Sequence, residues 1–162
     1  MALHLPLPDD TTSEVLAREY AAARARGGSV MAILRALGPR AEVVQAFLQL
    51  SEAVLYGPAA LGHREREVLA LATSEANRAD YSAAVHVQLL ERHGGAQPDD
   101  QALVDFARRL TLAPHEAGEA VADLRRHCSE QEVYDAIAVV GLLNFANRAA
   151  LATGISADDD LS

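Results

Sequence analysis

Two residues near the middle of the sequence, Glu67 and His86, carry side chains that could exchange protons. Each falls in a segment with helical spacing of apolar residues, and Asn77 lies in the connection between the two segments. Because Glu67 and His86 stand at nearly equal distances from Asn77 along the chain, antiparallel packing would place them at a similar height. A carboxylate beside an imidazole fixes the imidazole tautomer and raises its basicity, as a general base or proton shuttle requires. The same pair is also a common structural hydrogen bond, and the spacing leaves both interpretations open.

Around this pair the sequence resembles the core motif of the carboxymuconolactone decarboxylase and alkylhydroperoxidase D-like family, above all its peroxidase-related branch. That motif runs from Arg-Glu near a helix start to Asn-x-Cys-x-Tyr/His-Cys-x-x-x-His across the next turn and helix. The positions that match it are Arg66, Glu67, Asn77, Tyr81 and His86. A later segment that begins at Asn144 is similar to the last helix of that branch. The likeness extends over about residues 40–155.

The resemblance implies roles for the matched residues. In the family's peroxidases the second motif cysteine attacks the peroxide, the first resolves the product, and the Glu and final His form a proton relay. Ala79 and Ser82 stand at the two cysteine positions of this chain. A serine does not ionise near neutral pH and cannot form the sulfenic acid and disulfide of the thiol cycle. We therefore expect no thiol peroxidase activity, and the candidate catalytic residues are Glu67, His86, Ser82 and Tyr81.

Three functions are consistent with these residues. The first is a peroxidase-related protein, of an oxidoreductase and antioxidant family, that has lost its thiol chemistry and kept the relay. The second is a thiol-independent decarboxylase or proton-transfer enzyme for a small organic acid, a chemistry that the same superfamily also contains. A hydrolase built on Ser82 and His86, one helical turn apart, is weaker because the sequence identifies no oxyanion hole. The third function is a non-catalytic oligomeric module that binds a small molecule.

The single cysteine, Cys128, lies just before a helix whose first turn carries the capping box Ser129–Glu132. There it can pack as a small apolar residue in a hydrophobic staple with Val133. The basic residues at positions 125–127 would instead lower the pKa of its thiol and give it a redox role. Of these two interpretations the packing role is the better supported.

Histidine and glutamate spacing also raises the question of a metal site. His63 and Glu67 are one helical turn apart, and His86 and His93 are two turns apart. The sequence has no HExxH motif of the kind that binds zinc on one helix, and no glycine-rich phosphate loop. It therefore predicts neither a metal ion nor a cofactor.

Composition limits the partners. The chain has 162 residues and a formal net charge of −9, whereas nucleic-acid binders normally carry a basic stripe. One cysteine excludes a disulfide within the chain. The N-terminal residues lack the basic start and apolar run of a secretory signal, and no apolar stretch reaches the ~18–20 residues that span a bilayer. We expect a cytoplasmic protein that binds neither nucleic acid nor membrane.

Half of the residues are hydrophobic but only 4% are aromatic, and alanine, the best helix former, is abundant. Capping and stop residues predict helices over about 11–27, 29–36, 40–57, 63–76, 79–93, 99–112, 114–126 and 129–153. We expect one all-α domain over residues 1–162, of roughly seven or eight helices, with an extended arm at 1–10 and a frayed tail at 156–162. The resemblance implies the alkylhydroperoxidase D-like fold for this domain.

The last predicted helix is apolar nearly all round, which is typical of a helix that is central or buried against another subunit. The resemblance adds that proteins of this family place their sites near subunit contacts. We therefore expect a homo-oligomer, a trimer or hexamer first and a dimer second, with a small molecule as its other partner.

Overall fold

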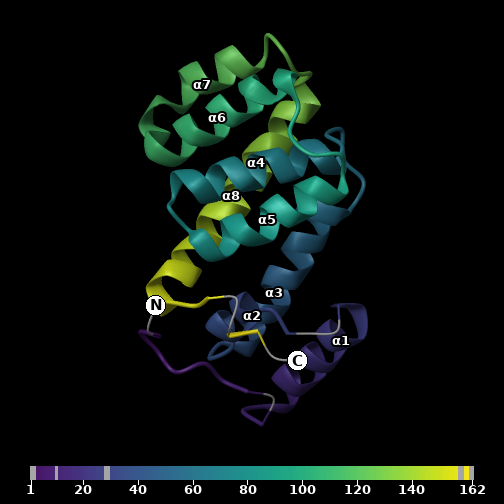
Figure 1. The fold of residues 1–162 in the computed structure, drawn as a ribbon, viewed down its shortest axis with the longest axis vertical. Coiled ribbons are helices and arrows are strands. Elements are labelled where there is room, and N and C mark those ends of the chain that lie inside the picture. Colours follow the sequence, from purple (N-terminus) through teal and green to yellow (C-terminus); the bar gives the residue numbers. More distant parts are fainter. Residues whose placement is uncertain (1–2, 10, 28–29, 157–158, 161–162) are drawn as a thin grey trace. The chain divides into compact units, whose positions relative to one another are not determined.

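The structure, a computed structural model, describes residues 3–9, 11–27, 30–156 and 159–160. Its α-helices are α1 (Glu14–Gly27), α2 (Ala32–Leu37), α3 (Ala41–Ser51), α4 (His63–Ala76), α5 (Asp80–Arg92), α6 (Gln101–Leu112), α7 (Ala117–Leu124) and α8 (Glu130–Thr153). The shorter elements are the π-helix η1 (Glu52–Tyr56) and the 3-10 turns η2 (Pro98–Asp100) and η3 (Pro114–Glu116). The described residues contain no β-strand (Figure 1). The predicted all-α class, with seven or eight helices, is confirmed.

Contacts between residues divide the chain into two compact units. Unit 1 consists of Met1–Leu50 with Arg148–Ser162, and unit 2 consists of Ser51–Asn147. Every candidate catalytic residue lies in unit 2, whereas both ends of the chain belong to unit 1. The single domain expected over residues 1–162 stays a prediction.

The ends of the chain meet within unit 1. Residues 3–9 form no helix, as expected for the arm, and the His4 N–H donates to the Thr153 carbonyl at 2.9 Å. In the tail, the Asp160 carboxylate accepts a hydrogen bond from the Ala32 N–H at 2.6 Å. The Asp160 side chain thus caps the start of α2, and the frayed tail expected at 156–162 stays a prediction.

The first helix begins differently from the prediction. Thr11, at the start of the helix predicted over 11–27, does not cap it, since the Thr11 side chain donates to Asp9 at 2.5 Å. Instead, the Leu16 N–H donates to Ser13 Oγ at 3.2 Å, which makes Ser13 the capping residue of α1. The cap predicted at Ser29 lies outside the described residues.

Unit 2 is built around α4, which packs against α5, α6 and η1, while α7 packs against α6 (Figure 1). The buried residues of α4 are Arg66, Glu67, Val68, Leu69, Ala70, Ala72, Thr73 and Ser74. The hydroxyls of Thr73 and Ser74 donate to carbonyls one turn back, at 2.7 and 2.8 Å, so they enter the core with their hydrogen bonds made. The charged side chains of Arg66 and Glu67 are buried because neighbouring elements cover the middle of α4.

A three-residue turn connects α4 to α5. Asn77 ends α4, Arg78 adopts a left-handed backbone with φ of 55°, and Ala79 precedes α5. This conformation costs a residue other than glycine about 1–2 kcal/mol, and the turn is closed by a bond of 2.9 Å from the Ala79 N–H to the Ser74 carbonyl. α5 then returns antiparallel to α4 and ends at Arg92, shortly before Gly94 and Gly95, which both have positive φ. The predicted bounds of both helices are confirmed to within a residue or two.

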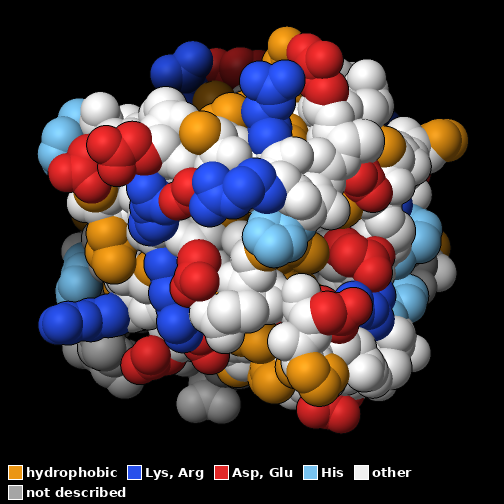
Figure 2. Space-filling view, turned by 90° about the horizontal axis from the view of Figure 1, so that it is seen from above, with side chains coloured by type: hydrophobic (Ala, Val, Ile, Leu, Met, Phe, Trp, Pro, Cys, Tyr) orange, Lys and Arg blue, Asp and Glu red, His pale blue; other side chains and the backbone are white. Residues whose placement is uncertain are grey.

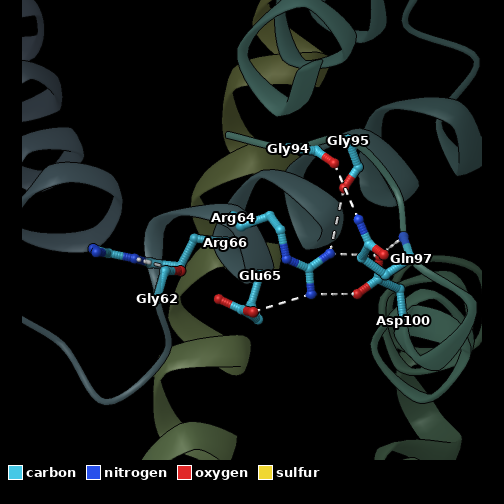
Figure 3. Close-up of polar contacts among 8 residues, drawn as sticks. All are labelled: Gly62, Arg64, Glu65, Arg66, Gly94, Gly95, Gln97 and Asp100. Atoms are coloured by element: carbon cyan, nitrogen blue, oxygen red, sulfur yellow. Dashed lines mark hydrogen bonds and ion pairs between the residues drawn. The ribbon is translucent and has the colours of Figure 1, made fainter. Parts of the chain in front are cut away.

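A charged clamp between Arg64 and Asp100 fixes the loop between α5 and α6 (Figure 3). Nη1 and Nη2 of Arg64 each donate to one oxygen of the Asp100 carboxylate, both at 2.8 Å. The same carboxylate accepts the Gln97 N–H at 2.7 Å and completes the capping box of η2. Burial alone would raise the pKa of Asp100, but the bonds from Arg64 and Gln97 outweigh it and lower the pKa. The clamp thereby joins the starts of α4 and α6.

The longest helix, α8, contributes residues to both units. Its predicted capping box is confirmed: the Ser129 N–H donates to Glu132 at 2.7 Å, and the Glu132 N–H donates to Ser129 Oγ at 3.3 Å. Gly154, with φ of 74°, ends the helix as expected. By length and composition α8 is the one described helix that could cross a membrane, but half of its most apolar window is buried inside the protein. A buried core helix has the same composition, so this finding carries little weight.

Candidate acid–base site

Glu67 and His86 meet inside unit 2, as their spacing predicts. Glu67 Oε2 lies 2.7 Å from His86 Nδ1, and only 5% and 9% of the two side chains, respectively, are exposed. α4 supplies the carboxylate from its enclosed middle, and α5 supplies the imidazole from across the antiparallel pair. The two helices therefore hold a titratable pair together in the core.

The hydrogen bond to Glu67 determines which imidazole nitrogen of His86 is basic. With the carboxylate as acceptor, Nδ1 carries the proton and the lone pair of the neutral ring lies on Nε2. Nε2 makes no hydrogen bond to any described residue. It can therefore accept a proton from a bound molecule, and the nearby carboxylate would stabilise the imidazolium that forms.

Ala79 and Ser82, at the positions where the family motif has cysteines, are both buried beside the start of α5. Ser82 lies one turn before His86, yet its hydroxyl makes no hydrogen bond to His86 or Glu67 in the described part of the chain. The structure thus brings together Glu67 and His86 but does not form the serine arrangement that a hydrolase would need. Tyr81 is half-buried on the same helix, and its role stays a prediction.

Amide side chains connect the α4–α5 turn to α8. Asn77 Nδ2 donates to Asn144 Oδ1 at 3.0 Å, and Asn144 Nδ2 donates to Thr111 Oγ1 of α6 at 3.1 Å. One turn further along α8, the fully buried Asn147 donates to Ser74 Oγ at 3.4 Å. The two segments of the sequence that resemble the family are therefore in direct contact at this turn.

Arg66, the residue before Glu67, is buried, and its side chain contacts backbone carbonyls and one imidazole. Nη1 donates to the carbonyls of Gly57 at 2.9 Å and Val54 at 3.3 Å. Nε donates to the Gly62 carbonyl at 3.4 Å, and Nη2 lies 3.2 Å from His63 Nδ1. The side chain therefore ties the end of η1 and the following loop to α4, at the residue before Glu67 (Figure 3 shows the contact with Gly62).

Carboxymuconolactone decarboxylases match the sequence over residues 41–121, half of the chain. The chain belongs to the carboxymuconolactone decarboxylase family. The matched region includes Glu67, Ser82 and His86. The buried pair of Glu67 and His86 therefore lies in the part of the chain that matches the family. No curated protein matches the chain.

Solved structures give the same fold. The alkylhydroperoxidase core of a peroxidase-related protein from Ralstonia eutropha JMP134 superposes with a TM-score of 0.80 at 22% identity, covering 96% of this chain and 92% of the other. A peroxidase-related protein from Silicibacter sp. TM1040 gives 0.75 at 24% identity, covering 94% and 90%. A debrominase in complex with 2,3,4-tribromopyrrole gives 0.78 at 16% identity, covering 97% and 92%. At these identities the likeness shows the alkylhydroperoxidase D-like fold, which is therefore confirmed.

Tyr56 is a further residue of interest in this family member, and the sequence did not predict a role for it. It is the last residue of η1, which packs against α4. The pKa of Tyr56 is raised, first by burial and then by the negative charges of Glu67 and Glu52. Tyr56 thus belongs to an element that contacts the helix carrying Glu67. Its place directly before the helix-ending Gly57 was the only signal in the sequence.

The histidines considered for a metal site form a stacked pair instead. The rings of His63 and His93 lie 5.8 Å apart between centroids, with 18° between their planes. Within the residues that the structure describes, no group of three or more His, Cys, Asp or Glu side chains is placed to hold a metal ion.

Cys128 lies half-buried before α8. Burial and the negative charge of Glu132 raise the pKa of its thiol. The interpretation in which its basic neighbours lower that pKa is therefore wrong, and the nearby Arg126 pairs with Asp123 at 2.7 Å. A thiol of this kind is little ionised at neutral pH and poorly suited to attack a peroxide.

Proposed function

We propose that this member of the carboxymuconolactone decarboxylase family is a peroxidase-related protein that works without a thiol. Glu67 and His86 act in it as an acid–base pair that transfers a proton to or from a small organic acid, including one that loses carbon dioxide. The observation that supports this most is the buried hydrogen bond of 2.7 Å between Glu67 Oε2 and His86 Nδ1. It leaves Nε2 as the basic atom in a site from which most water is excluded.

The side chains around the pair support a function without peroxide reduction. Ala79 and Ser82 provide no sulfur, and the only thiol, Cys128, has a raised pKa. The chemistry that remains needs only proton movement. His86 Nε2 removes a proton from a carbon next to a carbonyl group, the C–H electron pair forms a carbon–carbon double bond as the carbonyl π pair moves onto the oxygen, and the proton later returns to the same or a neighbouring carbon.

A small planar molecule fits the fold of this family member. One structure that shares the fold is a debrominase bound to 2,3,4-tribromopyrrole, a compact aromatic ring. We infer a substrate of comparable size, a keto acid or a lactone acid.

The net charge of −9 and the interspersed acidic and basic side chains in Figure 2 do not favour nucleic acid as a partner. We also propose a cytoplasmic location.

Proton abstraction can be measured without knowing the natural substrate. Nitroethane is a simple carbon acid whose nitronate anion absorbs ultraviolet light, and keto and lactone acids exchange their acidic hydrogens in deuterated water, which NMR detects. We expect His86→Gln and Glu67→Gln to slow both reactions by about a hundredfold or more, the usual contribution of a general base. The matched controls are His115→Gln and Glu75→Gln, which change exposed residues of the same types.

A purely structural Glu67–His86 pair predicts a different outcome. In that case neither reaction would run faster with the wild-type protein than with His86→Gln, although His86→Gln and Glu67→Gln would still lower the free energy of unfolding. Retained folding, measured by circular dichroism, together with lost proton transfer would support the acid–base role.

We further propose that the protein is a homo-oligomer that associates through α8. Ile137 and Phe145 are 39% and 47% exposed, and Gly141 lies between them at helical spacing on the same face. A side chain added at Gly141 would meet no atom within 4 Å. This apolar stripe with an open centre is suited to close approach of a helix from a second copy of the chain.

The stripe can be tested at its centre. We expect Gly141→Arg to leave the subunit folded, because the space beside it is open, and to convert the oligomer to a monomer in light scattering. Gly141→Ala is the control, since alanine favours the helix and adds little bulk. A wild-type mass of 17.2 kDa in solution would contradict the proposal.

A further inference from the structure

The π-helix η1 is an irregular element placed beside the acid–base pair. α3 changes at Glu52 to the wider π pattern, in which the Gly57 N–H donates to the Glu52 carbonyl at 2.6 Å. π-helical turns are rare, and this one forms the last turn of the helix, directly before the extended residue Gly57. Here the π turn ends in Tyr56 and packs against α4, the helix that carries Glu67.

Arg66 holds this turn in place. Its Nη1 binds the carbonyls of Val54 and Gly57, which lie on either side of Tyr56 in the sequence. Moving a guanidinium out of water costs free energy. Buried arginines commonly pair with carboxylates, so a buried arginine bound to backbone carbonyls is unusual. The result is that Tyr56 is fixed relative to the residue directly before Glu67.

The Tyr56 hydroxyl is available to a ligand. It makes no hydrogen bond to any described residue, and 49% of the residue is exposed. The phenol is protonated at neutral pH and is a hydrogen-bond donor, since the ordinary pKa of a tyrosine already lies well above 7. A donor without a protein acceptor, on an element that Arg66 ties to the residue before Glu67, has the properties needed to bind a negatively charged oxygen.

We propose that Tyr56 is a third catalytic residue, which donates a hydrogen bond to the oxygen of the substrate on which negative charge develops, and that Arg66 is its positioning residue. This inference rests on the proposed function. His86 Nε2 takes the proton as the C–H bond breaks, the C–H electron pair forms a carbon–carbon double bond as the carbonyl π pair moves onto the oxygen, and the Tyr56 O–H stabilises that oxygen without transferring its own proton. The site thereby acquires the oxyanion stabilisation that the sequence did not identify.

The first test measures nitroethane deprotonation, in which the nitro oxygens take the developing charge. We expect Tyr56→Phe to lower kcat by about a hundredfold, the usual effect of losing one oxyanion donor, with a small change in KM. The matched control is Tyr134→Phe, which removes the hydroxyl of an exposed tyrosine on α8. Arg66→Lys keeps a positive charge but cannot bind two carbonyls at once, and we expect it to lower kcat in the same direction.

The second test follows the ionisation of Tyr56 itself and does not depend on activity. Subtracting the ultraviolet pH titration of Tyr56→Phe from that of the wild type isolates this phenol among the four tyrosines. We expect Glu67→Gln and Arg66→Lys each to lower the pKa of Tyr56, the first by removing a negative charge and the second by releasing η1 from α4. A merely structural Arg66 would reduce stability and leave that pKa unchanged.

The outcomes separate this inference from the proposed function. If His86→Gln loses proton transfer while Tyr56→Phe matches the wild type, the role of Tyr56 is overturned and the acid–base pair stands. If the wild type transfers no proton, the proposed function falls and the catalytic role of Tyr56 falls with it. If Arg66→Lys folds and leaves both kcat and the Tyr56 titration unchanged, Arg66 is not a positioning residue.

Discussion

Asn77 and Asn144 lie 67 residues apart in the sequence and are joined side chain to side chain at 3.0 Å. Asn77 ends α4 at the turn that leads to α5, and Asn144 lies in α8 and also donates to Thr111 of α6. One pair of amides thus links the turn between α4 and α5, the helices that carry Glu67 and His86, to α8 and α6. The junction thus fixes the turn between the two helices that carry the pair, although neither asparagine belongs to it.

Replacing Asn144 with Ala removes this junction. It removes one acceptor of the Asn77 amide, which still donates to the Thr73 carbonyl, and it leaves the Thr111 hydroxyl without its donor. A buried polar group left without its partner costs about 1–3 kcal/mol. We expect Asn144→Ala to reduce the free energy of unfolding in urea by that amount. Gln131→Ala, which removes an exposed amide from the same helix, serves as the control and should change little. Equal stability of the two variants would contradict the prediction.

The Asp100 carboxylate makes the free energy of unfolding depend on pH. Its pKa is lowered in the folded protein, so its contribution is present above the unfolded-state pKa of ~3.9 and is lost as the pH falls through the folded-state pKa. We expect Asp100→Asn to cost about 3 kcal/mol near neutral pH, because Arg64 loses its buried partner, and to flatten the decline in stability below pH ~4. Thermal unfolding between neutral and acidic pH measures this, with Asp99→Asn as the neighbouring control. An unchanged pH profile for Asp100→Asn would show that other carboxylates dominate.

Cys128 should react slowly. Because burial and Glu132 raise the pKa of its thiol, less thiolate is present at pH 7 than in an ordinary cysteine. We expect alkylation by iodoacetamide to be severalfold slower than in the unfolded chain. Glu132→Gln removes the negative charge while keeping a residue suited to the capping box, and should raise the rate. A rate in the native protein above that of the unfolded chain would instead indicate an activated thiol.

Restoring the two cysteines tests whether the relay is intact. Ala79 and Ser82 flank the start of α5, and Ser82 is one turn from His86. We expect Ala79→Cys combined with Ser82→Cys to reduce an organic hydroperoxide with a dithiol, whereas the wild type should not. Adding His86→Gln to the double variant should remove the new activity. If the double variant folds but stays inactive, the pair does not serve a thiol at this position.

The sequence predicted those features that depend on local patterns. The bounds of α4 follow from its stop at Asn77, and the capping box of α8 follows from two residues three positions apart. Equal spacing about one turn was enough to bring Glu67 and His86 together. These signals need no knowledge of distant parts of the chain.

Other features depend on contacts between distant segments. The change of α3 to a π-helix is not apparent in a pattern that reads as one helix over 40–57, because Arg66 and the packing against α4 select it. The charged composition of the tail predicts no contact with the rest of the chain. The Asp160 carboxylate nevertheless accepts a hydrogen bond from the N–H of Ala32, the first residue of α2, which has no acceptor within the helix. Tyr56 was missed for the same reason, since its proximity to Glu67 exists only in the folded chain.

The π-helix also has a consequence for insertions and deletions. A π turn contains one residue more than an α turn closing the same length of helix, so deleting one residue within Glu52–Tyr56 would let the helix continue in regular α form. The deletion would shorten the segment between α3 and Gly57 by one residue, so Tyr56 would not keep its present position relative to Arg66 and α4. We expect relatives with the shortened helix to have lost the tyrosine near the carboxylate. The length of this short stretch would then divide the family by chemistry as well as by sequence.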